Sequence, residues 1–275
     1  MRALNRNYIY TSTITASDVT GYTFASALVD SRLCRKGRFS GTTGTLNIDL
    51  GTAKQCDYVA IISHNLTPDA TVSITYSYDN SSWAVLTYIP RNWLETYTRI
   101  TPEGDTRITS DGDTRIVTFD HPFTTLWDNN LAPFARYWRI TFTDPRNADG
   151  YVEIGGVYLG SYIQLPAMSP DQTIPRNSTS EQSFNETGQL HAYRKYQYKG
   201  VGVNFPAVTD AEKNALDELF VESDITDPLL LIFWEDDTGS QVVEEPLYCV
   251  LSKLGEPKHI GNGLWSYSLS FRECK

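Results

Sequence analysis

The histidines are the first residues to test for chemistry, since imidazole is a common general base and a common metal ligand. They are isolated from one another, and the sequence contains neither an HExxH motif nor a GxSxG serine elbow. Gly155 and Gly156 lie within a strand pattern, which indicates a bulge or close packing and not a phosphate-binding loop. We therefore expect no catalytic residue and no cofactor. The histidines are His64, His121, His191 and His259.

The cysteines and the paired carboxylates also give no reactive site. The cysteines are far apart and include no CxxC pair, so we expect reduced thiols and no metal site. The pairs Asp236–Asp237 and Glu244–Glu245 lie in or beside turns, where a solvated surface is commoner than an acid and base couple. Nothing supports glycoside hydrolysis, and we expect a protein that is not an enzyme. The cysteines are Cys34, Cys56, Cys249 and Cys274.

Aromatic side chains are better candidates for a site, because apolar sugar faces stack on exposed rings. Trp83, Trp93, Tyr97 and Trp127 fall in or near expected loops and are candidate carbohydrate-binding residues. The alternative is that these rings pack a long insertion, residues 84–133, onto the body of a domain. Both interpretations stay open from the sequence.

The phrase GDTRI occurs twice, starting at Gly104 and at Gly112. Two copies are too few for a solenoid, and the spacing fits the two arms of an inserted β-hairpin. Such strands would place Arg107 and Arg115 on one face, which makes this hairpin a candidate interaction element. A solvated hairpin without a partner is the alternative.

Composition indicates a β-rich protein of about two domains. The chain has 275 residues, of which 40% are hydrophobic, and it contains 17 Tyr, 11 Phe and 6 Trp. No apolar run approaches the ~20 residues that span a bilayer, and the N-terminus lacks the apolar core of a signal peptide. We expect a soluble protein made in a cytoplasm.

The net charge of -10 is unevenly distributed. Residues 166–275 hold 9 Lys and Arg against 17 Asp and Glu, and so carry -8 of the total. Affinity for phosphate backbones requires clustered cations, so we expect no specific nucleic-acid binding.

The N-terminal half contains segments in which apolar and polar residues alternate, as in half-buried strands. They include LNIDLG at residues 46–51, TVSITYSYDNSSW at 71–83, ARYWRITFTDP at 135–145 and YVEIGGVYLG at 151–160. Their order and wording resemble the discoidin, or coagulation-factor type C, domain, a galactose-binding-like jelly roll. The resemblance implies a jelly-roll β-sandwich over residues 1–162, with the insertion at 84–133, that binds surfaces or partners.

Residues 163–184 are rich in Pro, Ser, Thr and Asn, which is typical of a linker or a surface arm. Residues 185–275 then predict a second β domain with one helix. Thr209 and Glu212 are spaced as a capping box for a helix over 209–221. Strands are expected at 229–234, 247–254 and 265–271, with a hairpin turn at Asn262–Gly263.

The C-terminal pattern is similar to the belt or tube-like β-sandwich, with one flanking helix, of distal tail proteins in tailed bacteriophages. This resemblance implies a structural protein of a tail tip or baseplate in the virion, synthesised in the host bacterial cytoplasm. There it would form a ring, of six subunits in that family, between the tail tube and the host-recognition apparatus. Expected partners are other tail proteins, namely tube, hub and fibre proteins, and Asp and Glu of residues 210–245 would partly face a DNA channel. The alternative is a carbohydrate-binding module that attaches to host surface glycans.

Overall fold

The structure, a computed structural model, divides the chain into two compact units. The jelly-roll unit is Tyr8–Leu159, and the C-terminal unit combines Met1–Asn7 with Gly160–Lys275. The residues that the structure describes are 2–17, 19–21, 23–30, 32–67, 69–86, 89–91, 95–98, 116–119, 124–128, 133–169, 175–184, 189–193, 195–223, 225–232 and 246–274.

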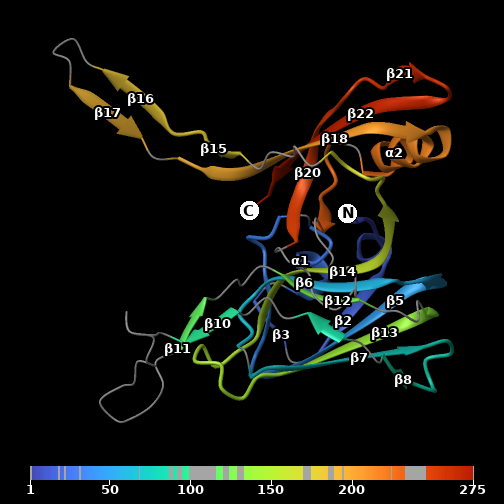
Figure 1. Cartoon of the computed structure of the whole chain (residues 1–275). Coiled ribbons are helices and arrows are strands. Elements are labelled where there is room, and N and C mark those ends of the chain that lie inside the picture. The colour runs from blue at the N-terminus through green and yellow to red at the C-terminus, as the bar shows by residue number, and fades with distance from the viewer. Residues whose placement is uncertain are drawn as a thin grey trace. The chain divides into compact units, whose positions relative to one another are not determined.

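Antiparallel strands build the jelly-roll unit as two sheets, which confirms the predicted β-sandwich (Figure 1). One sheet has the order β2 (Thr13–Ala16), β5 (Thr43–Gln55), β13 (Phe134–Thr143), β7 (Thr71–Ser77) and β8 (Ala84–Val85). The other has the order β14 (Glu153–Gln164), β6 (Tyr58–His64), β12 (Thr124–Asp128) and β9 (Ile89–Arg91), and β4 (Gly37–Phe39) pairs with both β14 and β3 (Val19–Thr20).

The core of this unit lies between the two sheets and follows the alternation in the sequence. Trp138, Ile140 and Phe142 of β13 are buried, whereas the residues between them are partly exposed. A 3-10 turn at Tyr8–Thr11 and strands β2 and β3 precede the short helix α1 (Phe24–Ala27). This helix adds Phe24 to the core. The ring centroids of Phe24 and Phe39 lie 4.4 Å apart, and burial of these aromatic rings stabilises the sandwich.

The predicted insertion at 84–133 is described in part. Strands β10 (Glu95–Thr98) and β11 (Ile116–Phe119) pair antiparallel, with Thr98 opposite Ile116. The GDTRI repeat, with Arg107 and Arg115, lies outside the described residues apart from Ile116.

In the C-terminal unit, strands from both ends of the chain form one sheet. Its order is β15 (Arg176–Ser178), β18 (Gln197–Thr209), β22 (Leu264–Glu273), β20 (Leu247–Leu254), β19 (Leu229–Ile232), β1 (Arg2–Asn7) and the end of β14. Strand β21 (Lys258–Gly261) pairs with β22 through the predicted two-residue turn, where Asn262 and Gly263 both have positive φ, 52° and 71°. Residues 233 and 234 of the predicted 229–234 strand, and the Asp236–Asp237 pair after it, lie outside the described residues.

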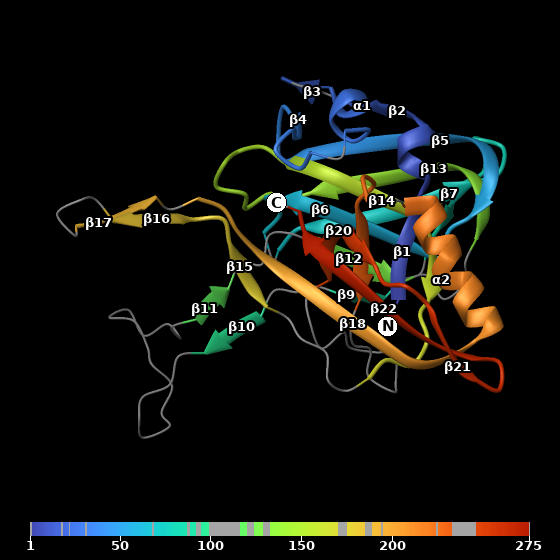
Figure 2. The ribbon, with the colours of Figure 1, turned by 90° about the horizontal axis from the view of Figure 1, so that it is seen from above.

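Helix α2 (Asp210–Ser223) confirms the predicted capping box. The Thr209 backbone N–H donates to Glu212 Oε2 at 2.8 Å, and the Glu212 N–H donates back to Thr209 Oγ1 at 3.3 Å. Leu216 and Leu219 are fully buried and pack α2 against the sheet. The helix thus has one apolar face, and Figure 2 shows it beside β1.

The carboxylates of α2 contact groups within their own unit. Glu222 accepts hydrogen bonds from Arg6 at 2.8 Å, and Asp217 accepts one from the Tyr267 hydroxyl at 2.9 Å. Burial, and then the bond to Asp217, raises the pKa of Tyr267. The predicted acidic channel stays a prediction, and residues 233–245 of it, including Glu244–Glu245, lie outside the described residues.

The structural division differs from the predicted domains at the N-terminus of the chain. Residues 2–7 belong to the C-terminal unit, because β1 pairs with β19 and with the end of β14. Within residues 163–184, predicted as a linker or arm, β15 pairs with β18, and β16 (Glu181–Phe184) pairs with β17 (Leu190–Tyr193). The segment therefore forms part of an arm that projects from the sheet of its unit (Figure 1).

Candidate binding surfaces of the jelly-roll unit

The outer face of the five-stranded sheet gathers polar side chains from distant segments. The strand register places Asn47, Arg139, Thr75 and Val85 in one cross-strand row. Asn47, Arg139 and Thr75 alternate with buried residues of β5, β13 and β7, so they lie on the face away from the core, and Val85 of β8 is exposed. Trp83 immediately precedes β8 at the edge of this face.

Arg139 holds the indole of Trp83 on this face. Its guanidinium carbon lies 4.0 Å from the Trp83 ring centroid, and its Nε donates a hydrogen bond of 2.8 Å to Asn47 Oδ1. A guanidinium over an indole is held by charge and ring quadrupole, and the bond to Asn47 limits the rotamers of the arginine. Trp83 is half-buried, so part of its ring stays open to solvent.

A second charged group lies one row further along the same sheet. Arg136 donates to both carboxylate oxygens of Asp49, at 2.7 and 2.9 Å, and its guanidinium lies 4.8 Å from the Tyr137 ring centroid. The hydrogen bond from Arg136 lowers the pKa of Asp49, and a 2.8 Å bond from the Gly51 N–H adds to this effect. The face therefore carries ionised groups beside an aromatic ring.

This surface has the elements that carbohydrate recognition requires. A sugar offers an apolar face that stacks on an indole and hydroxyls that exchange hydrogen bonds with Arg, Asn and Asp. Among the described residues of this face, no histidine or cysteine contacts the charged groups.

The structure places one of the four predicted aromatic residues on this face, namely Trp83. Trp93 lies outside the described residues, as do the side chains of Tyr97 in β10 and Trp127 in β12. Arg139 and Asn47 were not predicted as site residues. Their polar positions between apolar residues in alternating strands could have marked them as outward-facing. Their contact with each other depends on the register of β5 and β13, which the alternation does not specify.

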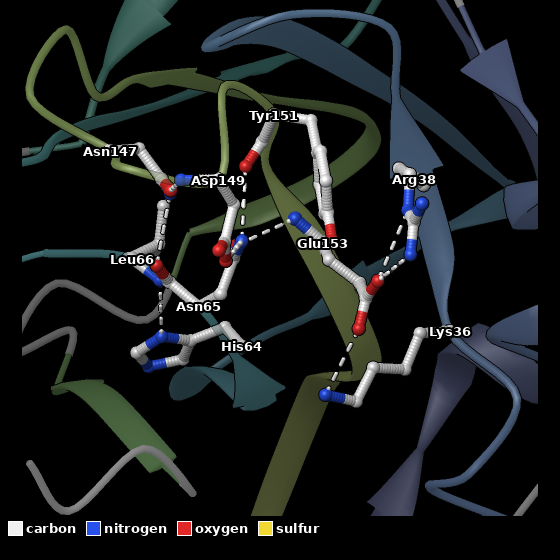
Figure 3. A network of polar contacts seen from close by, with 9 residues as sticks. All are labelled: Lys36, Arg38, His64, Asn65, Leu66, Asn147, Asp149, Tyr151 and Glu153. Atoms are coloured by element: carbon white, nitrogen blue, oxygen red, sulfur yellow. Dashed lines mark hydrogen bonds and ion pairs between the residues drawn. The ribbon is translucent and has the colours of Figure 1, made fainter.

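A second group of polar residues lies in loops of the same unit (Figure 3). Asn65 donates hydrogen bonds of 3.0 Å to Asp149 Oδ2 and to the Tyr151 carbonyl, and its Oδ1 accepts one of 2.8 Å from the Glu153 N–H. Asn65 thus fixes the 144–151 loop against the end of β6. All these hydrogen bonds join groups of the jelly-roll unit to one another, so we interpret the network as one that stabilises the fold.

Glu153 forms ion pairs with Lys36 at 3.1 Å and with Arg38 at 2.7 Å. Burial alone would raise the pKa of Glu153, but hydrogen bonds from Arg38 and Lys36 outweigh that effect and lower it. Arg38 also lies 3.9 Å over the ring centroid of Tyr151 (Figure 3). These contacts tie β4 to the start of β14.

His64 is buried at the end of β6 and follows Ser63, which has a positive φ of 54°. Its Nδ1 accepts a hydrogen bond of 3.2 Å from the Leu66 N–H. Burial lowers the pKa of His64 from 6.5 to about 4, with a further lowering by Lys36 and an opposing effect of Asp144. His64 is therefore a neutral acceptor within the fold at neutral pH.

The cysteines and acidic residues do not form a metal site in the part of the chain that the structure describes. Burial raises the pKa of the Cys56 and Cys249 thiols, which keeps them protonated and unreactive. Among the described helices, none is long and apolar enough to cross a membrane.

Comparison with known proteins finds no matching family model and no matching curated protein. Solved structures similar to this chain include carbohydrate-binding modules. One is chitosan-binding module 1 of a chitosanase/glucanase from Paenibacillus sp. IK-5, at 18% identity and a TM-score of 0.36, covering 57% of this chain and 99% of that one. Another is the family 32 module of Clostridium perfringens NanJ in complex with galactose, at 16% identity and a TM-score of 0.34, covering 59% of this chain and 100% of that one.

Proposed function

We propose that the jelly-roll unit binds carbohydrate on the outer face of its five-stranded sheet, without catalysis. The observation that carries this proposal is the half-buried Trp83 ring, which is held at 4.0 Å by Arg139, itself hydrogen-bonded to Asn47. A ring held in this way loses little conformational freedom when a ligand stacks on it, so binding costs less entropy.

The neighbouring polar groups would set the preference among sugars. Asn47 and Arg139 offer an acceptor and donors in the same row as Thr75. The Asp49 carboxylate with Arg136 lies one row away and can accept hydrogen bonds from hydroxyls at the rim. Such a site favours neutral sugars with adjacent hydroxyls over a flat apolar ligand.

The test is a glycan array followed by titration calorimetry with galactose and chitosan oligosaccharides, which the two similar structures name. Trp83→Ala should weaken binding by about tenfold, since loss of an aromatic contact costs about 1 kcal/mol or more. Val29→Ala, at an exposed position after α1 and outside the strands of the five-stranded sheet, is the control and should leave affinity unchanged. Equal affinity of the Trp83 variant and the parent would refute this site.

A second candidate is a structural role in a bacteriophage tail tip or baseplate, as a ring subunit in the virion that joins the tail tube to the host-recognition apparatus. The observation that favours it is the arm of the C-terminal unit, in which β16 and β17 form a two-stranded sheet of their own. Isolated hairpins are marginally stable in water, so a projecting hairpin is typical of a segment that gains contacts on assembly. Sedimentation of the full chain over a range of concentrations tests whether it associates.

A further inference from the structure

Arg139 has no carboxylate partner among the residues that the structure describes. The jelly-roll unit has six arginines with described side chains, and five of them form ion pairs with Asp or Glu. The sixth, Arg139, bonds to the neutral amide oxygen of Asn47. Because a guanidinium stays charged at neutral pH, this face has a positive charge that no described acid neutralises. The paired arginines are Arg32, Arg35, Arg38, Arg136 and Arg146.

Most of the hydrogen-bond donors of Arg139 are unused. A guanidinium has five N–H groups, and the Nε–H of Arg139 donates to Asn47 at 2.8 Å. The other four N–H groups have no acceptor in the described part of the chain. Two parallel N–H groups of a guanidinium match the two oxygens of a carboxylate, and the charge strengthens both bonds. Arg139 therefore offers both the shape and the charge of a carboxylate site.

Two acidic side chains in the segments around Arg139 are bound to other groups. Asp49, one row away on the same face, accepts hydrogen bonds from Arg136 on both of its oxygens, at 2.7 and 2.9 Å. Asp79, in the turn that leads to Trp83, accepts hydrogen bonds of 2.9 Å from two backbone N–H groups of its own turn. These bonds hold the two carboxylates in their present positions, so neither compensates the charge of Arg139.

Two contacts hold the guanidinium of Arg139 in place before a ligand binds. Its carbon lies 4.0 Å from the ring centroid of Trp83, and its Nε–H is bonded to Asn47. Arg139 and Trp83 are both half-buried, which removes part of the water around the charge and strengthens its interactions. An arginine that is already held loses less rotamer entropy when it binds a ligand.

We propose that Arg139 binds the carboxylate of an acidic sugar unit, such as a uronic acid, which is linked to the neutral sugar on Trp83. The inference rests on the proposed carbohydrate-binding function and names its substrate class, a polysaccharide that contains both neutral and acidic units. The net charge of -10 disfavours a densely charged polyanion such as a nucleic acid. A polysaccharide with separated carboxylates can instead present one carboxylate to one cation.

The test compares an acidic ligand with the same molecule after its carboxyl groups have been reduced to alcohols. The probes are the tetrasaccharides of hyaluronan and of unsulfated chondroitin, in which neutral and acidic units alternate. In calorimetry with the full chain, the acidic form should bind about tenfold more tightly than the reduced form, since hydrogen bonds between charged groups are the stronger ones. This preference should shrink between about 0.05 M and about 0.5 M salt, because salt screens the charges.

Variants of Arg139 test whether this residue causes the preference. Arg139→Gln should abolish it, so that the acidic and reduced forms bind equally, and Arg139→Lys should retain part of it by keeping the charge without the planar fork. Loss of support for Trp83 would weaken both forms alike, so the ratio of the two affinities reports on the carboxylate contact. Arg146→Gln makes the same change of charge in the loop after β13 and should leave the ratio unchanged.

The outcomes separate this inference from the proposed function. Equal affinity of the parent for both forms, together with loss of binding in Trp83→Ala, would overturn the acidic unit and leave carbohydrate binding standing. A preference that survives in Arg139→Gln would also overturn the inference, because another cation would then hold the carboxylate. A parent protein that binds neither probe would overturn it as well, whereas the glycan array with Trp83→Ala decides the proposed function separately.

Discussion

Replacing His64 by asparagine should make the jelly-roll unit less sensitive to acid. In the folded protein the imidazole is buried and accepts a hydrogen bond from the Leu66 N–H, so its protonated form is disfavoured. Asparagine offers an oxygen acceptor near the position of Nδ1 but cannot take up a proton. The free energy of unfolding should therefore depend on pH more strongly in the parent protein than in His64→Asn. This holds even if the substitution also changes stability by an amount that does not depend on pH.

The magnitude follows from the two pKa values of His64. Because the folded value of about 4 lies below the ordinary 6.5, the unfolded chain binds more protons between these values. The stabilisation is fully present above pH 6.5 and is lost as the pH falls towards 4, by about 3.4 kcal/mol in total at about 1.4 kcal/mol for each pH unit. At pH 5 the expected loss relative to pH 7 is about 2 kcal/mol.

The assay is urea denaturation of the parent and of His64→Asn at pH 7, 6 and 5, followed by tryptophan fluorescence. Carboxylates titrate in both proteins, so their contribution cancels when the variant is compared with the parent at each pH. The parent should lose about 2 kcal/mol more than the variant between pH 7 and pH 5. His259→Asn makes the same change at an exposed position and is the matched control. A difference between parent and His64→Asn that stays constant with pH would refute the reasoning.

Three further substitutions probe the fold. Gly44→Ala should cost about 1–3 kcal/mol in thermal unfolding, because the new methyl would lie 2.2 Å from the buried Phe39 ring. Gly41→Ala, with open space at the added carbon, is its control, and equal losses in both would contradict the packing. Thr209→Ala should lower the free energy of unfolding by about 1 kcal/mol because it removes the cap of α2, and Thr209→Ser should retain most of the stability of the parent. Urea denaturation measures both variants, and equal stability of the alanine and serine variants would contradict the cap. Glu153→Gln should cost about 1 kcal/mol at low ionic strength and less in about 1 M salt, and a salt-independent loss would argue against the ion pairs.

Local patterns made much of the fold predictable. The alternation in residues 138–142 places Trp138, Ile140 and Phe142 in the core, and the same holds for Tyr267, Leu269 and Phe271 of β22. The capping box and the Asn262–Gly263 turn involve residues within a few positions of each other. Such local patterns can be recognised without knowing which strands pair, so a single sequence is enough to predict these elements.

Contacts between distant segments were not predictable from the same patterns. Arg139 contacts Trp83 because β13 pairs with β7 in one particular register. The polar residues of both strands would also be compatible with other registers. Arg6 meets Glu222 across 216 positions, and nothing near Arg6 indicates that β1 belongs to the C-terminal unit. The Pro-rich and Ser-rich composition of residues 163–184 predicted a linker or a surface arm but no strands, because the strands there form only by pairing with residues further along the chain.

The pairing of β1 with β14 has a consequence for how such a protein can diversify. Asn7 and Gly160, the residues at which the chain leaves and re-enters the C-terminal unit, are direct partners in the ladder. The whole of Tyr8–Leu159 is thus threaded into what would otherwise be a short hairpin loop. Recombination at these two neighbouring points would replace the whole Tyr8–Leu159 unit, including the first part of β14, while β1 and residues 160–164 stay with the C-terminal unit, so the two units can diverge separately.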